Sequence, residues 1–496
     1  MMAFVDAFWM LAAPEIIGII AASAIFGLFV GSTPGLSATM ATALLVPVTF
    51  FMPPVAAIAA IVTCAAMAIF AGDIPAALLR IPGTPASAAY ASETYNLSIK
   101  GKLDLALGAN LMASAFGGLV GTAILILAAP QLASFALSFS SFEYFWLALL
   151  GLSCAALVST GSPLKGIVAL CVGLWLSTIG LDVVMGYPRF TFGIIDLQGG
   201  VSLIAVLIGA FAVAELLRKA ADVGTPLPEP AKIEGSILRG QAKNLWRYKK
   251  GLIRGSLSGT VIGALPGAGA DIAAWISYAV SKKFSKTPEL YGTGHVEGVV
   301  EASAANNASL SGAYVPALVF GIPGDTITAI VIGVLIIKGI TPGPMVFITS
   351  PDLIAAIYLV FITANILMVP LGIFAIHAGR RVLMLRSGVL FPVILLFCII
   401  GAFATNNAIF DVWIILVIGI AIWLMEANGY PAAPLVLGLV LGRVVEENLV
   451  NSLIISDGSL LAFFYRPIAG FLGAVTILIW TLPVLALLVR RLRRSG

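Results

Sequence analysis

Four proline-glycine pairs interrupt apolar parts of this sequence and could form a binding site for a small ion. They are Pro34-Gly35, Pro82-Gly83, Pro266-Gly267 and Pro323-Gly324. Proline lacks a backbone N–H and disfavours a helical residue before it, whereas glycine accepts dihedral angles that other residues avoid. Each pair therefore predicts a break in a helix. Such a break leaves backbone groups free, and inside a membrane they must face protein or a polar cavity.

Small polar side chains surround these breaks. A helix that begins after a break directs free N–H groups at an anion, and exposed carbonyl and hydroxyl oxygens suit a hard cation such as Na⁺. The alternative is a set of kinks whose hydroxyls bond to their own backbone. We favour a binding site because the four breaks form a symmetric set. The predicted substrate-binding residues at the breaks are Ser32, Pro34, Gly35, Ser37, Thr39, Gly83, Thr84, Ser87, Pro266, Gly267, Gly269, Gly324 and Thr326.

Two carboxylates follow the breaks in the second half of the chain. Asp271 lies shortly after Pro266, and Asp325 lies two residues after Pro323. Carboxylates inside a membrane are costly and indicate function. Together with Thr328 they are predicted to bind a coupling cation, and one of them could instead carry a proton. The alternative is a carboxylate that caps a helix N-terminus, and the sequence leaves both possibilities open.

Asn306 and Asn307 are the strongest single candidates for substrate contact. They end a polar segment that leads into an apolar stretch. Paired amides supply donors and acceptors without charge, which suits a carboxylate ligand; the alternative is a helix cap. Arg80 and Arg189 are weaker candidates for pairing with an anion. The two histidines, His295 and His377, stand alone, so no catalytic or metal site is predicted beyond a possible Na⁺ site, and no cofactor.

Membrane helices must position these residues. Hydrophobic residues make up 60% of the 496 residues and charged residues only 10%, against roughly 25% charged in soluble domains. No Asp, Glu, Lys or Arg occurs between Ile16 and Gly72, and a transmembrane helix needs about 20 apolar residues. We therefore expect an all-α polytopic membrane protein with about 10–12 transmembrane helices.

The breaks belong to an internal repeat. The motif Gly27-x3-Gly31-x2-Pro34-Gly35 recurs 232 residues later as Gly259-x3-Gly263-x2-Pro266-Gly267. A second motif follows in each half, and Pro75-Ala76-x4-Ile81-Pro82-Gly83 recurs 241 residues later as Pro316-Ala317-x4-Ile322-Pro323-Gly324. Two motifs in the same order indicate two related halves with broken or re-entrant helices.

Charge predicts the orientation of the halves. Nine basic residues and three acidic ones lie between Arg218 and Arg254, so this loop and the Arg-rich C-terminus are predicted to be cytoplasmic. The first half has no Lys or Arg before Arg80, which favours an outside N-terminus and inverted repeats. A nucleic-acid role is not expected, because the basic clusters border apolar spans. The expected parts are an N-terminal membrane repeat (1–217), a cytoplasmic basic linker (218–254), a C-terminal repeat core (255–380) and additional helices (381–496).

At these residues the sequence resembles the large membrane subunit of tripartite tricarboxylate transporters, the TctA family, over essentially the whole chain. The motifs that carry the resemblance are Ile81-Pro82-Gly83-Thr84-Pro85-Ala86-Ser87-Ala88, Gly186-Tyr187-Pro188-Arg189-Phe190-Thr191-Phe192-Gly193, Gly263-Ala264-Leu265-Pro266-Gly267-Ala268-Gly269-Ala270, Ala304-Ala305-Asn306-Asn307-Ala308 and Gly321-Ile322-Pro323-Gly324. The family often has Thr at Asp271 and Ser at Asp325. These two added carboxylates point to altered cation coupling or to a substrate other than citrate.

The resemblance implies uptake of a tricarboxylate or related carboxylate across the bacterial inner membrane, driven by a Na⁺ or H⁺ gradient. The implied partners are a small membrane subunit (TctB-like), a periplasmic substrate-binding protein (TctC-like) and the lipid bilayer. We expect alternating access in which one part of the protein carries the site, as in an elevator. The alternatives are a channel, or a membrane enzyme acting on lipid-like substrates, which the isolated histidines disfavour.

Overall fold

The fold is almost entirely helical. It is given by a computed structural model that describes residues 2–33, 36–158, 162–182, 185–220, 235–267, 269–382 and 387–495. Within these ranges the strands are confined to one short antiparallel pair, β1 (Gly180–Leu181) and β2 (Pro188–Arg189), with Gly180 opposite Arg189. The predicted all-α class is thus confirmed.

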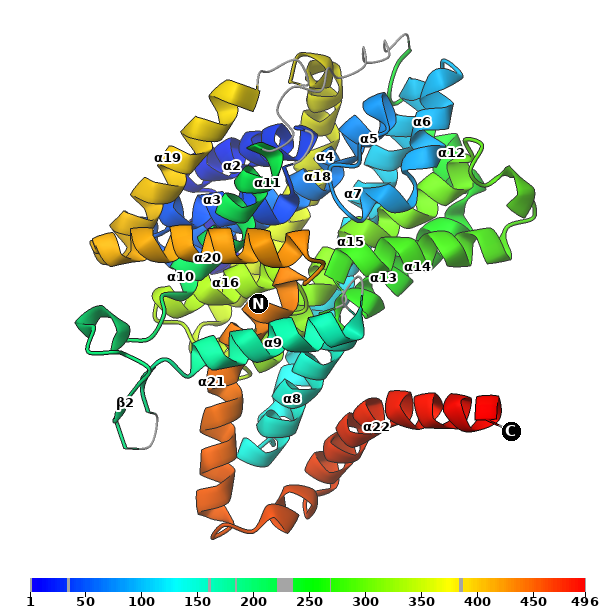
Figure 1. Cartoon of the computed structure of the whole chain (residues 1–496). Helices are drawn as coiled ribbons and strands as arrows, with labels where there is room; N and C mark the ends of the chain where they lie inside the picture. The colour runs from blue at the N-terminus through cyan, green and yellow to red at the C-terminus, as the bar shows by residue number, and fades with distance from the viewer. Residues whose placement is uncertain are drawn as a thin grey trace. The chain divides into compact units, whose positions relative to one another are not determined.

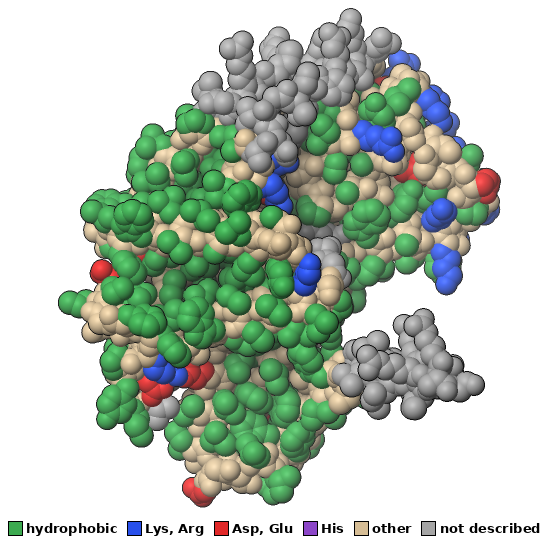
Figure 2. Space-filling view, viewed as in Figure 1, with side chains coloured by type: hydrophobic (Ala, Val, Ile, Leu, Met, Phe, Trp, Pro, Cys, Tyr) green, Lys and Arg blue, Asp and Glu red, His purple; other side chains and the backbone are tan. Residues whose placement is uncertain are grey.

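Several helices are long and apolar enough to cross a membrane. Among the described residues there are five such spans, namely Pro14–Ser32, Pro54–Leu79, Leu103–Ala136, Pro351–Gly379 and Ile409–Ala427, together with seven shorter apolar helices. Hydrophobic side chains cover most of the face shown in Figure 2, as expected for helices that contact lipid. These features confirm a polytopic membrane protein, while the number of complete passes stays a prediction.

The chain forms two compact units, each made of two segments. Unit 1 comprises 1–133 and 204–424, and unit 2 comprises 134–203 and 425–496. The two units are defined by the contacts that residues make within each of them. The predicted division into repeats at 217, 254 and 380 stays a prediction, and the middle of the predicted linker, 221–234, lies outside the described residues.

The first repeat of unit 1 contains two helices in direct backbone contact. It is built from α2 (Pro14–Ser32), α3 (Ala38–Thr49), α4 (Pro54–Ala71) and α5 (Asp73–Leu79), and α2 lies beside α4 (Figure 1). A Cβ atom on Gly27 would overlap the carbonyl oxygen of Cys64, and one on Gly31 would overlap that of Ala68. These two glycines therefore allow α2 to approach α4 closely.

The second repeat packs in the same way. It contains α13 (Lys249–Gly263), α14 (Gly269–Phe284), α15 (Val296–Phe320) and α16 (Thr326–Ile337). Gly259 and Gly263 of α13 face the carbonyl oxygens of Ala305 and Ser309 of α15, where a Cβ atom would again overlap. The two glycines correspond to Gly27 and Gly31 at the offset of 232, and their two contacts correspond to Cys64 and Ala68 at the offset of 241. The sequence repeat is thus also a repeat of packing.

Further helices complete the two units. Those of unit 1 are α1 (Met2–Leu11), η1 (Ser87–Ala89), α6 (Ala91–Ile99), α7 (Leu103–Ala136, whose last turn belongs to unit 2), α10 (Leu203–Ile208), η3 (Gly209–Val213), α11 (Ala214–Ala220), α12 (Gln241–Arg247), η4 (Pro288–Leu290), α17 (Val346–Thr349), α18 (Pro351–Val382), α19 (Ser387–Asn406) and α20 (Ile409–Ala427). Those of unit 2 are α8 (Ser141–Val158), α9 (Pro163–Ser177), η2 (Ile195–Leu197), α21 (Ala432–Ile455), η5 (Leu460–Phe464) and α22 (Pro467–Ser495).

Unit 2 has its own aromatic core. Phe142 and Trp146 of α8 pack against Phe463, and the indole N–H of Trp146 donates to the carbonyl oxygen of Phe463 at 2.9 Å. This bond satisfies the polar end of a buried ring. Of the predicted binding residues, the weaker candidate Arg189 lies in unit 2, and those at the breaks lie in unit 1.

Candidate substrate and cation site

At the first break one hydroxyl bonds to the helix before the break, and another caps the helix after it. The hydroxyl of Ser32 donates to the carbonyl oxygen of Phe29 at 3.1 Å, so it bonds to its own helix as the kink alternative predicts. Ser37 instead caps α3, since its hydroxyl oxygen accepts from the N–H of Met40 at 3.1 Å. Pro34 and Gly35 lie outside the described residues.

The second break is closed by a reciprocal pair of hydrogen bonds. The N–H of Thr84 donates to the hydroxyl of Ser87, and the N–H of Ser87 donates to the hydroxyl of Thr84, both at 3.1 Å. Both side chains are buried. These two bonds hold the loop between α5 and η1 in a fixed shape.

The fourth break repeats this pair with a carboxylate in place of a hydroxyl. The N–H of Asp325 donates to the hydroxyl of Thr328 at 2.9 Å, and the N–H of Thr328 donates to the carboxylate of Asp325 at 2.8 Å. Asp325 thereby caps α16. This is the capping alternative considered for the sequence, and the predicted role of Asp325 and Thr328 in binding a cation stays a prediction.

Within each repeat the two breaks lie against each other. The N–H of Gly267, which follows the half-buried Pro266, donates to the carbonyl oxygen of Gly324 at 2.8 Å. In the first repeat, a Cβ atom on Gly83 would lie 3.0 Å from the carbonyl oxygen of Gly31. Glycine is needed at these places because two backbones meet there.

The breaks of one repeat also contact those of the other. The hydroxyls of Thr39 and Thr326 lie 3.0 Å apart, which joins the first break to the fourth. The indole N–H of Trp275, on the helix after the third break, donates to the carbonyl oxygen of Pro85 in the second break at 3.2 Å. The structure therefore brings all four predicted breaks together within unit 1.

The start of α14 also reaches the fourth break. Gly269 has a φ of 57°, and a Cβ atom on it would lie 2.9 Å from the Cβ of Asp325. Only a residue without a side chain fits there in that conformation. Asp271 follows in the first turn of α14, but its side chain lies outside the description.

Asn306 and Asn307 lie in the middle of α15, so the helix-cap alternative is wrong. They are 1% and 2% exposed. The amide nitrogen of Asn306 donates to the hydroxyl of Tyr90 at 3.3 Å, and that of Asn307 contacts the sulfur of Met368 at 3.6 Å. Among the described residues neither amide oxygen has a hydrogen-bond partner. Buried polar atoms are rarely left unpaired, so each of these oxygens needs a donor that the described side chains do not supply. The predicted role of the pair in substrate contact stays a prediction.

A buried carboxylate that the sequence analysis missed lies beside this pair. Asp73 is fully buried and accepts from the hydroxyl of Tyr90, which is 2.8 Å from both carboxylate oxygens. The amide nitrogen of Asn110 donates to Asp73 at 2.8 Å and lies 3.0 Å from the hydroxyl of Ser303. The signal was an acidic residue inside the apolar span Pro54–Leu79.

The two arginines considered as anion partners have other roles. Arg80 ends α5 in a left-handed conformation, with its guanidinium 5.9 Å from the centre of the Tyr95 ring. Arg189 lies in unit 2 and donates two hydrogen bonds to Glu446, at 2.6 and 3.1 Å. This pairing raises the pKa of the Arg189 guanidinium above its ordinary value. Both terminal nitrogens of Arg189 are therefore paired within the protein.

Comparisons with known proteins agree with the motifs. The family model described as "Tripartite tricarboxylate transporter TctA family" matches residues 17–437. An uncharacterized 52.8 kDa protein from the TAR-I ttuC' 3' region of Agrobacterium vitis is 37% identical over 91% of this chain and 89% of its own length. A second uncharacterized protein, from the TAR-II ttuC' 3' region of the same organism, is 39% identical over 45% of this chain and 94% of its own length. No solved structure gives a significant match. The chain is therefore a member of the tripartite tricarboxylate transporter TctA family.

Proposed function

We propose that this chain is the large transport subunit of a secondary transporter that imports a tricarboxylate or related carboxylate across the bacterial inner membrane. A Na⁺ or H⁺ gradient drives uptake. A periplasmic substrate-binding protein delivers the substrate, and a small membrane subunit completes the complex. The family supports a tripartite transporter in general; the substrate class, the driving ion and the partners are part of the proposal.

The observation that carries the proposal is the meeting of the four helix breaks within unit 1, together with the adjacent amides Asn306 and Asn307 buried on α15 of the same unit. The first turns of α3 and α14 have N–H groups without intrahelical acceptors, which attract an anion. Asn307 adds an amide whose nitrogen contacts only the sulfur of Met368, a weak acceptor. A carboxylate held there would use neutral donors and helix ends rather than an arginine.

The pairing of the breaks supports a two-fold relation between the repeats. Thr39 and Thr326 join the first break of one repeat to the second break of the other, and Trp275 and Pro85 do the same with the repeats exchanged. A two-fold axis produces such an exchange. Combined with the cytoplasmic basic linker, this relation favours inverted repeats with the site between them.

The basic residues at one end of unit 1 support the orientation. Lys and Arg side chains gather in Figure 2 over the region where Figure 1 places α6 and α12. Exposed basic residues there include Lys100, Lys102, Lys243 and Arg247. By the positive-inside rule this end faces the cytoplasm.

The division into two units supports an elevator-like mechanism. The residues predicted at the breaks, Asn306 and Asn307 belong to unit 1, whereas the weaker candidate Arg189 lies in unit 2. A unit that holds the complete site can carry it across the membrane while another unit stays fixed. A channel needs no such separation.

The test is uptake of radiolabelled citrate, or of the carboxylate that the companion binding protein retains, into proteoliposomes containing both membrane subunits. Asn306→Ala and Asn307→Ala should each lower uptake at least about tenfold, because lost hydrogen bonds to a charged ligand are worth about 1.5–3 kcal/mol. Folding is checked by thermal unfolding in detergent.

Asn448→Ala is the matched control. Asn448 lies on α21 in unit 2, and its amide donates to the carbonyl oxygen of Val444 in its own helix. This variant should transport normally. Unchanged uptake by both site variants would remove the pair from the site, and uptake that persists after the Na⁺ and H⁺ gradients are collapsed would disprove secondary transport.

A further inference from the structure

Asp73 is a buried carboxylate that has no basic partner among the described residues. Among the described residues it contacts two polar side chains, Tyr90 and Asn110. A lone charge in this setting is costly, and a carboxylate that gains and loses a proton avoids carrying the charge throughout a cycle. The position therefore suits a group that titrates while the transporter works.

Among the described titratable groups, Tyr90 is the one that forms hydrogen bonds with Asp73. On α7, on the elements packed against α5, or next to α5 in the chain, the other described titratable groups are Glu15, Cys64, Arg80, Glu93, Tyr95, Asp104, Asp352, Tyr358 and His377. None of these described groups forms a hydrogen bond or an ion pair with Asp73. Glu93 accepts from Tyr278 at 2.6 Å. Glu301, on the helix that carries Ser303, is paired with Arg254 at 2.6 Å.

A chain of hydrogen bonds connects Asp73 to the candidate substrate contact. The hydroxyl of Tyr90 donates to Asp73, and the amide nitrogen of Asn306 donates to the hydroxyl oxygen of Tyr90. The Asn306 amide oxygen therefore points away from Tyr90 and is unpaired. This is the arrangement that an ionised Asp73 requires, because a carboxylate only accepts.

Protonation of Asp73 reverses the direction of this chain. The new carboxyl O–H can donate to the hydroxyl oxygen of Tyr90, which frees the hydrogen of Tyr90 to donate to Asn306. The Asn306 amide must then turn its oxygen toward Tyr90 and its nitrogen away. The atom of the Asn306 amide that faces away from Tyr90 then changes from an oxygen, which accepts, to a nitrogen, which donates. A carboxylate substrate needs donors.

We propose that Asp73 carries the coupling proton, and that Tyr90 transmits its protonation state to Asn306. This inference rests on the proposed transport function. One O–H bond forms on Asp73 when the proton arrives from water on the outer side with the substrate. The same bond breaks when the proton leaves to water on the cytoplasmic side, so one proton moves with each substrate.

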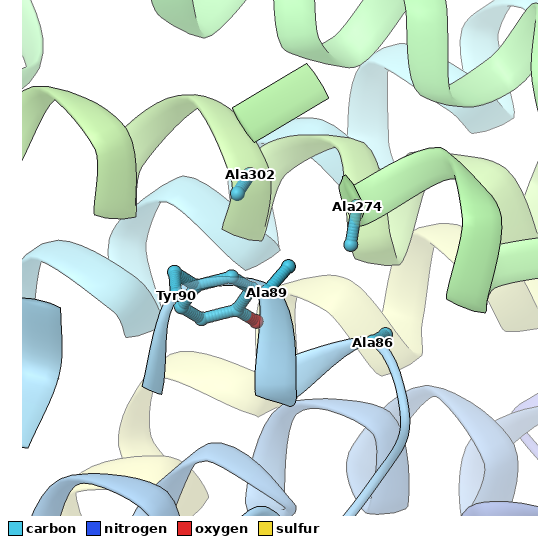
Figure 3. Close-up of a cluster of buried hydrophobic side chains, with 5 residues drawn as sticks. All are labelled: Ala86, Ala89, Tyr90, Ala274 and Ala302. Atoms are coloured by element: carbon cyan, nitrogen blue, oxygen red, sulfur yellow. The ribbon is translucent and has the colours of Figure 1, made fainter. Parts of the chain in front are cut away.

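The packing around Tyr90 fixes the position of its hydroxyl. The ring is fully buried in a cluster with Ala86 and Ala89, and α14 and α15 of the other repeat contribute Ala274 and Ala302. Figure 3 shows these side chains gathered around one point. A ring held by residues of both repeats cannot easily swing away, so a change in its hydrogen bonds must pass to its neighbours.

The test compares pH-driven uptake with exchange in the same proteoliposomes, which contain both membrane subunits and the loaded binding protein. Asp73→Asn keeps the shape of the side chain and always offers a donor, as the protonated acid does. The steady-state accumulation of substrate by the wild type should rise about tenfold for a gradient of one pH unit at zero membrane potential, because one proton per substrate balances a tenfold ratio of proton activity, which is about 1.36 kcal/mol. Asp73→Asn should respond less than about twofold while still exchanging internal for external substrate.

Asp104→Asn is the matched control, because Asp104 is a partly exposed carboxylate on α7 outside this chain of bonds; it should keep the full response. Tyr90→Phe provides a second variant that retains the carboxylate, and it should lose the response as Asp73→Asn does. A normal response in either variant overturns the proposal, as does wild-type uptake that follows Na⁺ and ignores pH. Failure of the wild type to take up any carboxylate would instead overturn the transport function.

Discussion

The two repeats of unit 1 have the same backbone packing and different polar side chains. In both repeats a pair of glycines brings one helix against the backbone of the next. However, Asn306 and Asn307 of the second repeat occupy the positions of Ala65 and Ala66 in the first. The polar groups have thus diverged on a common backbone.

The position of Asp73 shows the opposite asymmetry. Its equivalent in the second repeat is Tyr314, which is also fully buried and whose hydroxyl has no partner among the described residues. The first repeat therefore contributes the buried carboxylate, and the second contributes the amides. This asymmetry is consistent with the proposal that the substrate and the coupling proton are bound by different residues of unit 1.

The largest expected effect tests whether the shared packing is equally important in both repeats. Gly31→Ala and Gly263→Ala should each lower the free energy of unfolding by about 1–3 kcal/mol or more, because the new Cβ would meet backbone atoms that cannot move aside. Thermal unfolding in detergent measures the loss. Gly18→Ala on α2 is the control, because nothing lies within 4 Å of a Cβ there. If only one of the two variants lost stability, the conclusion that both repeats depend on the same packing would be wrong.

A smaller effect is expected where the repeats differ by a carboxylate. Asp325→Ala should cost about 0.5–2 kcal/mol of stability through the lost cap, and Asp325→Ser should cost much less because serine also caps. Thr84→Ala provides the same measurement in the first repeat. The other predicted role of Asp325 is cation binding, and the cation dependence of uptake by Asp325→Ser tests that role. An unchanged dependence removes Asp325 from the cation site, whereas a weaker cation affinity supports it.

The smallest effect concerns the hydroxyl pair that joins the repeats. Thr39→Val and Thr326→Val, alone and together, form a double-mutant cycle. We expect a coupling energy of about 0.5–1.5 kcal/mol for this hydrogen bond, measured by unfolding in detergent. A value near zero would show that the 3.0 Å approach of the two hydroxyls contributes nothing to joining the breaks.

The sequence predicts the repeats and breaks well because glycine spacing and Pro-Gly pairs act locally. It also draws attention to Asn306 and Asn307, two adjacent amides that the structure places in the buried middle of α15, and their role in substrate contact stays a prediction. Asp73 escaped notice because it directly follows the uncharged run that ends at Gly72, and its partners come from distant parts of the chain. Local pattern cannot predict which hydroxyls turn back to their own helix, as that of Ser32 does.

Unit 2 lies beyond sequence prediction for a related reason. It joins 134–203 to 425–496 across more than two hundred residues, and no repeated motif links the two segments. Their contacts are made by aromatic rings such as Trp146 and Phe463. Such rings occur throughout the chain, so their pairing depends on the fold.

The glycine contacts between α2 and α4, and between α13 and α15, have a mechanical consequence. Where one backbone lies directly on another, there are no side-chain rotamers that could change to let the helices slide. Sliding would force Cα atoms over the carbonyl oxygens of Cys64 or Ala305. Each helix pair should therefore move as one rigid piece. We therefore expect bending during the proposed transport cycle at the Pro-Gly breaks, where the helices are interrupted.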